Sequence, residues 1–356
     1  MRLERRADVP RLALLLAPLA AVALTLLLAS ALVAWAGAPV GRAYALLLEG
    51  GFGSRFAWGE TLTRATPLIL TGLAAALAFK ARLYNIGGEG QLYLGALAAV
   101  AVGGLHGGSG FDGVPAPLLF GLMLLAAMAA GALLLLGPAL LKLKLGADEV
   151  VTTLLLNFIA LLFVSAMLDG PMKDPTAMGW PQSVAVADAL QFERLIERSR
   201  VHRGLLLALA AACGLAALMR WSTFGLAVRA VGANPRAAAF AGLGVGRTVV
   251  VTALLSGALA GLAGALEVAG RTGYLTLDMA PGVGYSGIVV AMLAGLNPLA
   301  VVPAAVFVSG ILVGADGMGR TVGVPTYIAD AIVAIALLAL LFTSAAAGWR
   351  VRWGRG

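Results

Sequence analysis

Residues 85–91 read Asn85-Ile86-Gly87-Gly88-Glu89-Gly90-Gln91 and lie between two of the apolar stretches that fill this 356-residue chain. Hydrophobic residues make up 61% of the sequence and charged residues only 12%, whereas a soluble domain carries about a quarter charged residues. Such a chain has too little polar surface to face water. The composition therefore predicts an integral membrane protein, in which every polar group inside the lipid needs a partner or a function.

The apolar stretches predict about ten transmembrane helices, several of them short, because a spanning helix needs about 20 apolar residues. They cover residues 12–33, 61–79, 86–105, 117–141, 150–168, 204–219, 248–269, 284–296, 299–314 and 327–342. The first is longer than the apolar core of about 7–15 residues in a signal peptide, so we expect it to be retained. This predicts an all-α membrane domain over residues 12–342, between basic segments at 1–11 and 343–356.

The charges predict the orientation of these spans. With the N-terminus inside, the inner segments hold fifteen of the 25 Lys and Arg residues but only five of the 17 Asp and Glu residues. The positive-inside rule then places both termini in the cytoplasm. The outer side receives an interfacial segment at 35–60, a long polar loop at 169–203 and a shorter loop at 271–281. We expect residues 193–203 of the long loop to form a short solvated helix.

Two segments of similar sequence indicate an internal repeat. Gly87-Gly88-Glu89-Gly90-Gln91-Leu92 aligns with Gly284-Tyr285-Ser286-Gly287-Ile288-Val289, and the charge pattern predicts opposite directions for the two helices that follow. Oppositely oriented repeats with short or Gly-interrupted spans are typical of transporters, where they mark the central pathway. The alternative is that the glycines only permit close helix packing.

Several polar residues in these spans are candidates for a substrate pathway. They are Asn85, Glu89, Gln91, Asn157 and Ser286. Asn85 is placed to cap the following helix, and a carboxylate in a first helical turn is favoured by the helix dipole. Helix capping and bonding between helices are thus alternatives to substrate contact. We expect Glu267 to reach the outer membrane interface, and the sequence has no central pair of carboxylates or Asp/His chain to suggest proton coupling.

Residues 225–242 are expected to form a small cytoplasmic knob of two short helices. The first, Leu226–Val231, ends at Gly232, and the second begins with Asn234 as its cap and Pro235 in its first turn. Such a knob suits a groove on a partner protein, although a connector lying on the membrane surface explains the pattern equally well.

The remaining composition argues against other classes of protein. The chain has a single cysteine, Cys213, which excludes an internal disulfide and a cysteine-based metal site. It has two histidines, too few to predict a histidine-rich metal site. We predict no catalytic residues, since an intramembrane enzyme would need a nucleophile with a base or a metal motif. The net charge of +8 comes from scattered Arg residues beside anionic lipid, which does not predict nucleic-acid binding. The chain also lacks the Gly-x-x-x-x-Gly-Lys-Ser/Thr phosphate loop, so any ATP would be hydrolysed by another subunit.

Five segments resemble the permease subunits of nucleoside ABC importers, within the branched-chain amino acid and simple-sugar permease family. They are Leu70-Thr71-Gly72-Leu73-Ala74-Ala75-Ala76-Leu77-Ala78-Phe79-Lys80, Leu83-Tyr84-Asn85-Ile86-Gly87-Gly88-Glu89-Gly90-Gln91, Asp148-Glu149-Val150-Val151-Thr152-Thr153-Leu154-Leu155-Leu156-Asn157, Arg229-Ala230-Val231-Gly232-Ala233-Asn234-Pro235 and Gly284-Tyr285-Ser286-Gly287-Ile288-Val289-Val290-Ala291. The resemblance covers most of residues 61–314. Sugar permeases usually carry a Gly-Ile-Asp-Leu-Ser-type motif at the place of Asn85–Gln91, so this segment favours the nucleoside branch.

This resemblance implies an importer in a bacterial or archaeal cytoplasmic (inner) membrane. The expected partners are a cytoplasmic ABC ATPase that binds ATP and Mg²⁺, a second permease of different sequence, and an extracytoplasmic substrate-binding lipoprotein. This chain would bind no cofactor itself. Residues 225–242 would be the coupling element on the ATPase, through Gly225, Arg229, Gly232, Asn234, Pro235 and Arg236. A sugar or branched-chain amino acid permease, and an ATP-independent channel or secondary transporter, are the alternatives.

Overall fold

The computed structural model describes residues 2–5, 11–104, 113–197 and 199–322, and near the C-terminus 327–328, 331, 334–335, 338–339, 342–343, 346 and 349–352. Its contacts divide the chain into two compact units. The first comprises residues 1–61 and 308–356, and the second comprises residues 62–307. The predicted span 327–342 and tail 343–356 lie largely outside the described residues.

The first unit contains β1 (Arg2–Arg5), α1 (Arg11–Trp35), α2 (Val40–Phe52) and β2 (Trp349–Arg352). Helices α3 (Arg55–Lys80) and α12 (Pro298–Val322) contribute residues to both units. The second unit contains α4 (Gly88–Gly103), α5 (Ala116–Leu145), α6 (Glu149–Asp169), η1 (Asp188–Leu190), α7 (Gly204–Trp221), α8 (Thr223–Ala233), α9 (Pro235–Phe240), α10 (Val245–Glu267), the π-helical turn η2 (Val268–Thr272) and α11 (Val283–Leu293).

The predicted all-α membrane fold is confirmed, with fewer long spans than the ten expected. Among the described residues six helices are long and apolar enough to cross a membrane, or seven if the bent pair α1–α2 counts as one span. Of the other predicted spans, α4 and α11 are helices of 16 and 11 residues. An 11-residue helix is roughly 16 Å long, about half the thickness of the hydrocarbon core.

In the first unit, α2 occupies part of the segment 35–60, which we expected to lie at the membrane interface. It follows α1 after a bend of 115°. Its glycines pack directly on the backbone of α12, since a Cβ atom at Gly51 would overlap the carbonyl of Gly310. The helix forms because these small residues allow close backbone contact, which the aromatic, Gly-rich sequence alone does not indicate. β1 and β2 pair in antiparallel fashion, so the two ends of the chain lie together.

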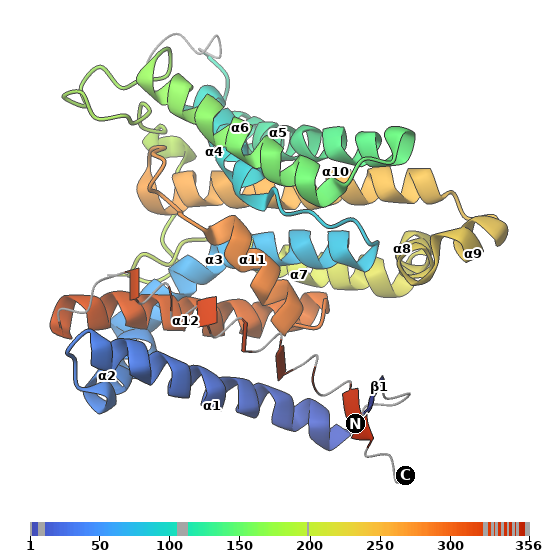
Figure 1. Cartoon of the computed structure of the whole chain (residues 1–356). Helices are drawn as coiled ribbons and strands as arrows, with labels where there is room; N and C mark the ends of the chain where they lie inside the picture. The colour runs from blue at the N-terminus through green and yellow to red at the C-terminus, as the bar shows by residue number, and fades with distance from the viewer. Residues whose placement is uncertain are drawn as a thin grey trace. The chain divides into compact units, whose positions relative to one another are not determined.

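In the second unit, α10 packs against α4 and α5, and these three helices form the centre (Figure 1). Glycines bring their backbones together, because Cβ atoms at these positions would overlap a neighbouring helix. These glycines are Gly95 of α4, Gly131 of α5, and Gly257, Gly261 and Gly264 of α10. Without a hydrophobic driving force between helices in lipid, such backbone contact supplies the packing energy.

The long polar loop between α6 and α7 is ordered by pairing rather than by a helix at residues 193–203. Leu195 donates its N–H to the carbonyl of Val201 at 2.8 Å, and Arg203 forms an ion pair of 2.6 Å with Glu193. The described residues of 193–203, all but residue 198, therefore form a hairpin-like turn, and the expected short helix is wrong. The mixed charges of this segment also fit a helical pattern, but in the structure Glu193 and Arg203 pair across the turn.

Candidate functional site

The polar segment at 85–91 begins where α3 stops. The backbone N–H of Leu83 bonds the carbonyl of Ala78 at 3.0 Å, and Arg82 takes a left-handed φ of 54°. This is a Schellman-type helix end, with arginine in the position that glycine usually fills. The chain then runs without helical structure to Gly87, and α4 begins at Gly88. This break gives α4 the short length expected of a broken span.

One face of α6 holds the segment that leads into α4. Glu149, Thr153 and Asn157 lie one helical turn apart, so their side chains share that face. Each side chain accepts a hydrogen bond from a backbone N–H group of the segment. The donors are Tyr84 at 3.4 Å, Ile86 at 3.2 Å and Gly90. We call Glu149, Thr153 and Asn157 the α6 stripe; it satisfies N–H groups that no helix or sheet would otherwise satisfy.

Asn85 and Gln91 are bonded to each other across the break. Each side-chain amide donates to the other's carbonyl oxygen at 2.9 Å, and both residues are buried. Asn85 also accepts from the N–H of Gly87 at 3.0 Å and donates to Ser256 of α10 at 3.4 Å. Gly87 occupies the N-cap position of α4, so Asn85 braces the preceding turn instead of capping the helix as expected.

Glu89 joins the start of α4 to the start of α11. Its two carboxylate oxygens accept hydrogen bonds from the N–H groups of Gly282 and Gly284, both at 2.6 Å. The side chain is 4% exposed. A carboxylate in this position is stabilised by the dipoles of both helices, because it lies at two N-termini. A Cβ atom at Gly284 would overlap the backbone of Glu89, so only glycine permits this approach.

From this meeting point α4 and α11 run in opposite directions. At the far end of α4, Gly103 contacts Val186 of the 169–203 loop. Beyond the far end of α11, Leu296 lies against Lys80, the last residue of α3. Each short helix is preceded by a non-helical segment. The arrangement agrees with the predicted inverted repeat and places both breaks side by side.

Asn157 and Tyr285 add a second connection between the two half-helices. Asn157 is fully buried; its side chain accepts from the N–H of Gly90 and donates to the hydroxyl of Tyr285. Ser286, the next residue of α11, is half-buried. Four of the five predicted pathway residues thus lie among the polar contacts around the breaks. We call this set of residues the central network: Asn85, Glu89, Gln91 and Asn157 with Thr153, Ser256 and Tyr285.

The sequence reasoning missed three members of the central network. Tyr285 lies in the same motif as Ser286, and Thr153 lies one turn before Asn157, so their spacing was a usable signal. Ser256 lies in a small-residue stretch of α10 and carries no such signal. Its hydroxyl donates to the carbonyl of Ala74 at 2.8 Å, which ties α3 to α10.

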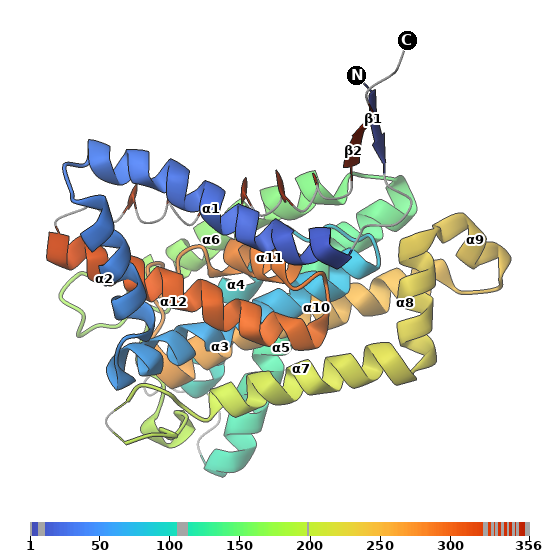
Figure 2. The same cartoon turned by 90° about the horizontal axis from the view of Figure 1, so that it is seen from below.

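The predicted knob at 225–242 consists of α8 and α9, which protrude at one end of the second unit (Figures 1 and 2). Asn234 caps α9 as predicted, accepting from the N–H groups of Arg236 at 3.0 Å and Ala237 at 3.1 Å. Pro235 is in the first turn of α9, as expected. Ser222 caps α8 through the N–H of Gly225 at 3.0 Å.

The glycines of α8 have a packing role that differs from the predicted one. The helix ends at Ala233, so Gly232 is not its C-terminal glycine. Instead, a Cβ atom at Gly232 would overlap the carbonyl oxygen of Lys80. A Cβ atom at Gly225 would lie 2.6 Å from the carbonyl oxygen of Leu218 in α7. Both glycines therefore let α8 press against the ends of neighbouring helices.

The two arginines of the knob are placed differently from each other. Arg229 donates to the carbonyl of Met219 near the end of α7, where a cation is favoured by the helix dipole. Arg236 is exposed on α9. Phe240, the last residue of α9, is 97% exposed. The outer face of the knob thus offers Arg236 and Phe240 to a partner, whereas Arg229 also braces α7.

A buried ion pair lies at the opposite end of α10. Glu267 is 2% exposed and pairs with Arg271 in the π-helical turn η2, so its carboxylate is held inside the protein; its expected position at the outer membrane interface stays a prediction. Arg271 also donates to the carbonyl of Met279. A buried carboxylate needs such a partner, and the π turn positions it.

His202, near this ion pair, is also buried. Its burial, reinforced by the charge of Arg271, lowers the pKa of its imidazole to about 4.

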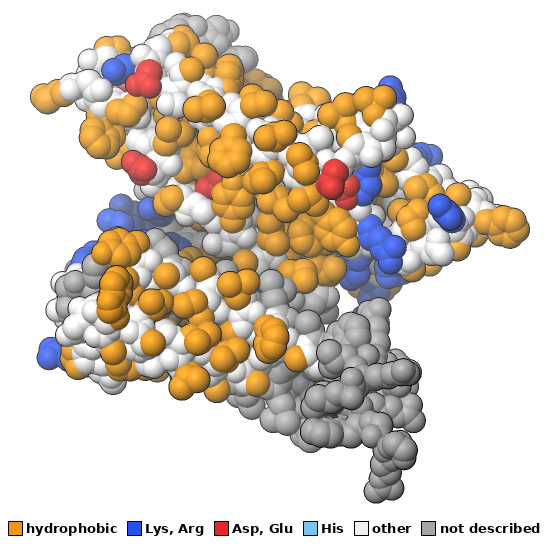
Figure 3. All heavy atoms as spheres, viewed as in Figure 1, with side chains coloured by type: hydrophobic (Ala, Val, Ile, Leu, Met, Phe, Trp, Pro, Cys, Tyr) orange, Lys and Arg blue, Asp and Glu red, His pale blue; other side chains and the backbone are white. Residues whose placement is uncertain are grey.

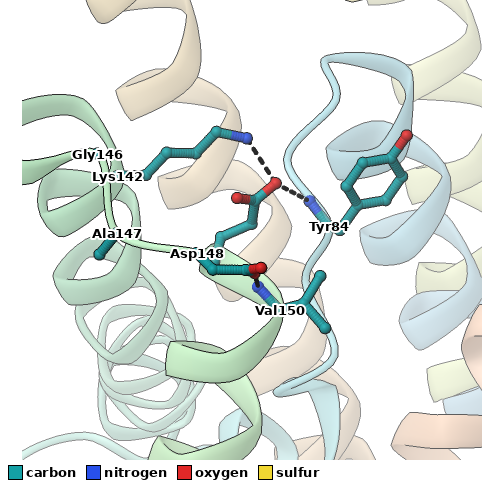
Figure 4. Close-up of a pocket in the computed structure, with 7 residues that line it drawn as sticks. Tyr84, Lys142, Gly146, Ala147, Asp148 and Val150 are labelled. Carbon is teal, nitrogen blue, oxygen red and sulfur yellow. Dashed lines mark hydrogen bonds and ion pairs between the residues drawn. The ribbon is translucent and has the colours of Figure 1, made fainter.

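Within the described part of the chain, no group of three or more His, Cys, Asp and Glu side chains is placed to hold a metal ion. The cavity shown in Figure 4 lies at the turn between α5 and α6. It has a volume of about 480 Å³. Its polar walls include Lys142 and Glu149, whose side chains form an ion pair of 2.5 Å. This pair fixes the turn rather than presenting a free ligand set.

The chain is similar to several curated transport proteins. It is 39% identical to the guanosine ABC transporter permease protein NupP of Bacillus subtilis over 93% of this chain and 94% of that protein. It is 37% identical to the glucose ABC transporter permease protein TsgB13 of Haloferax volcanii over 84% and 80% of the two chains. It is 31% identical to the nucleoside ABC transporter permease protein NupB of Lactococcus lactis over 82% and 80%.

A family model matches residues 57–341, which include the central network and the α8–α9 knob. The model describes the permease component of branched-chain amino acid transport systems. The chain therefore belongs to this family of permease components, and it is a multi-pass membrane transport subunit rather than an enzyme.

Proposed function

We propose that this chain is a permease subunit of an ATP-driven importer of nucleosides. The observation that carries the substrate class is its 39% identity with the guanosine permease NupP over nearly the full length of both proteins. The motif Asn85–Gln91, which distinguishes this chain from the usual sugar permease, lies at the centre of the polar network.

The importer works by alternating access around the meeting point of α4 and α11. These helices are broken near each other and run in opposite directions, as in transporters whose binding site lies between inverted repeats. The central network then lines or supports the pathway through Asn85, Glu89, Gln91, Asn157 and Ser286. Because most of its groups already bond one another, opening the pathway must exchange some of these bonds for bonds to the nucleoside.

ATP is hydrolysed with Mg²⁺ on a separate ABC ATPase, and α8–α9 are the coupling element that the ATPase moves. Two features support this assignment: the knob protrudes from its unit, and its exposed tip carries Arg236 and Phe240. A second permease completes the pathway, and a substrate-binding lipoprotein delivers the nucleoside to the 169–203 side. The permeases of such an importer rock against each other when the ATPase dimer closes.

We place both termini and the α8–α9 knob in the cytoplasm. Basic residues gather at the knob end of the second unit, and Figure 3 shows Lys and Arg side chains around α8 and α9 beside a largely apolar surface. The positive-inside rule assigns this end to the cytoplasmic side of the membrane. The pairing of β1 with β2 supports a common location for the two ends of the chain.

Uptake by proteoliposomes tests the proposal. They contain this chain with its co-purifying ATPase, the second permease and the binding protein, and labelled nucleosides or sugars are supplied outside with ATP inside. We expect nucleoside uptake that requires ATP. The similarity to TsgB13 makes glucose the second candidate, and uptake of glucose alone would replace the nucleoside assignment. Uptake without ATP or partners would overturn the ABC importer itself.

A further inference from the structure

Helix α8 touches the end of α3 backbone to backbone. Gly232 has no side chain, and the carbonyl oxygen of Lys80 fills the place where a Cβ atom would be. That same Cβ would lie 3.6 Å from Cα of Ala81. At the other end of α8, Gly225 presses on the last turn of α7 in the same way. Contacts without flexible side chains pass a displacement of α8 directly to the residues behind it.

Lys80 connects this contact to α11. Its ammonium group donates a hydrogen bond of 3.2 Å to the carbonyl oxygen of Leu296. Leu296 has a left-handed φ of 59° in the turn that ends α11, a conformation that costs a branched residue energy. The lysine therefore contacts α8 through its backbone and the end of α11 through its side chain.

The chain that follows Lys80 leads directly to α4. Lys142 donates to the carbonyl of Arg82 at 2.7 Å. Lys142 also pairs with Glu149, which accepts from the N–H of Tyr84 (Figure 4). Residues 81–87 are thus held to the α5–α6 turn and the α6 stripe, and they cannot take up a displacement by bending freely. Movement of Lys80 must reach both half-helices.

We propose that Lys80 is the joint through which α8 moves α4 and α11 together. Gly232 is the residue that makes the joint tight, and Leu296 is its contact on the second half-helix. The inference rests on the proposed function, since a partner ATPase must move α8. It assigns coupling roles to Lys80, Gly232 and Leu296, whereas the knob itself provides only the surface that receives the ATPase.

Two substitutions test the joint in the reconstituted complex, Gly232→Ala and Lys80→Ala. We expect each to lower ATP-driven uptake by about tenfold while the ATPase activity of the complex changes by no more than about twofold, because coupling and not hydrolysis is impaired. Gly246→Ala and Lys144→Ala are the matched controls. Gly246 has open space around it, and Lys144 is an exposed lysine in the last turn of α5. Equal loss of uptake and ATPase activity, or no loss of either, would overturn the joint.

A distance measurement tests the same joint without any substrate. In a Cys213→Ser background, spin labels at Leu226 of α8 and Met292 of α11 report whether the two helices move as one; both positions are exposed. When vanadate traps the ATPase, we expect this distance to stay constant while the distance from Leu226 to Leu133 of α5 changes. In Gly232→Ala, the first distance should change as well.

The two proposals fail in different ways. A complex that does not import nucleosides overturns the proposed substrate, yet the spin-label distances still report the joint because trapping needs only ATP and vanadate. A change between Leu226 and Met292 in the complex with Gly232 intact overturns the joint, whatever the substrate. An unchanged distance from Leu226 to Leu133 overturns it too, since α8 would then not move relative to α5, against which α4 packs.

Discussion

Glu89 is a buried carboxylate whose charge is balanced by backbone groups. It accepts two hydrogen bonds of 2.6 Å from Gly282 and Gly284 at the N-terminus of α11, and it lies in the first turn of α4. Bonds to a charged acceptor contribute more than neutral ones, and losing one strands a buried N–H group. At this residue, helix capping and a pathway role make different predictions.

The substitution Glu89→Gln separates these roles. If the carboxylate of Glu89 caps the two helices, the glutamine side chain keeps one oxygen that accepts from one of the N–H groups of Gly282 and Gly284. Its NH2 group then faces the other N–H group and cannot accept from it. We expect a loss of roughly 2 kcal/mol in stability, read as a lower thermal midpoint of the purified chain without substrate. Glu193→Gln, at an exposed ion pair, serves as the control. An unchanged midpoint with a raised KM for nucleoside would instead identify Glu89 as a direct substrate contact.

His202 predicts a pH dependence of stability. Its imidazole has an ordinary pKa of 6.5 when unfolded, and burial with the nearby Arg271 lowers the pKa to about 4 in the folded chain. Between these values the unfolded chain binds the proton and the folded chain does not, so stability falls as the pH drops below about 6.5 and continues to fall toward about 4. Thermal midpoints across this range should show the slope, and His202→Gln should flatten it. An equal slope in both proteins would contradict the assignment.

At the scale of elements, glycines determine how α4, α5 and α10 pack. A Cβ atom at Gly264 would overlap the carbonyl oxygen of Leu92, whereas Gly137 of α5 has open space around it. Gly264→Ala should therefore force α4 and α10 apart and lower the thermal midpoint, at a cost of about 1–3 kcal/mol, as is typical of overpacking. Gly137→Ala should be neutral or slightly stabilising because alanine favours helix. Similar midpoints for both variants would contradict close packing at Gly264.

The long apolar helices and the two broken spans could be predicted from the sequence, because their signals are local. Length and hydropathy marked α3, α5, α6, α7 and α10, and Gly-x-x-Gly with polar neighbours marked the starts of α4 and α11. Helix α2 was missed because its stability comes from backbone contact with glycines of α12, more than 250 positions later in the chain. The hairpin at 193–203 was missed because its charge pattern also fits a helix.

In the central network, too, the sequence indicated the residues but not their distant contacts. The residue types at Asn85, Glu89, Gln91 and Asn157 stood out because polar groups in apolar spans need partners. Their hydrogen-bond partners could not be predicted from the sequence. Glu89 bonds backbone N–H groups nearly 200 positions away, and every residue except proline has such a group, so the sequence does not indicate which ones it bonds. The two hydrogen bonds between the side-chain amides of Asn85 and Gln91 likewise depend on the geometry of the turn between them, which the sequence pattern alone does not supply.

At the scale of the whole molecule, the exposed tip of α9 predicts an assembly contact. Phe240 is 97% exposed at the end of the knob, where a large apolar side chain facing water is costly unless a partner covers it. Phe240→Asp should lower the amount of ATPase that co-purifies with the permease, while the thermal midpoint of the permease alone stays the same. The matched control is Trp180→Asp, which also replaces an exposed large apolar side chain but lies on the 169–203 loop; it should retain the ATPase. Leu206→Asp is not a suitable control, because it would place a charge on the candidate membrane-spanning helix α7.

The orientation of the chain gives a prediction that uses both ends of the second unit. Met178 is fully exposed in the 169–203 loop, and Phe240 is exposed on the knob. We expect a membrane-impermeant maleimide to label Met178→Cys in intact spheroplasts of a Cys213→Ser strain. Phe240→Cys should be labelled only after the membrane is permeabilised, because the basic residues around α8 and α9 favour the cytoplasmic side. The reverse pattern would place the knob outside, where no ATP is available. It would then contradict both the coupling role of α8–α9 and the joint at Lys80.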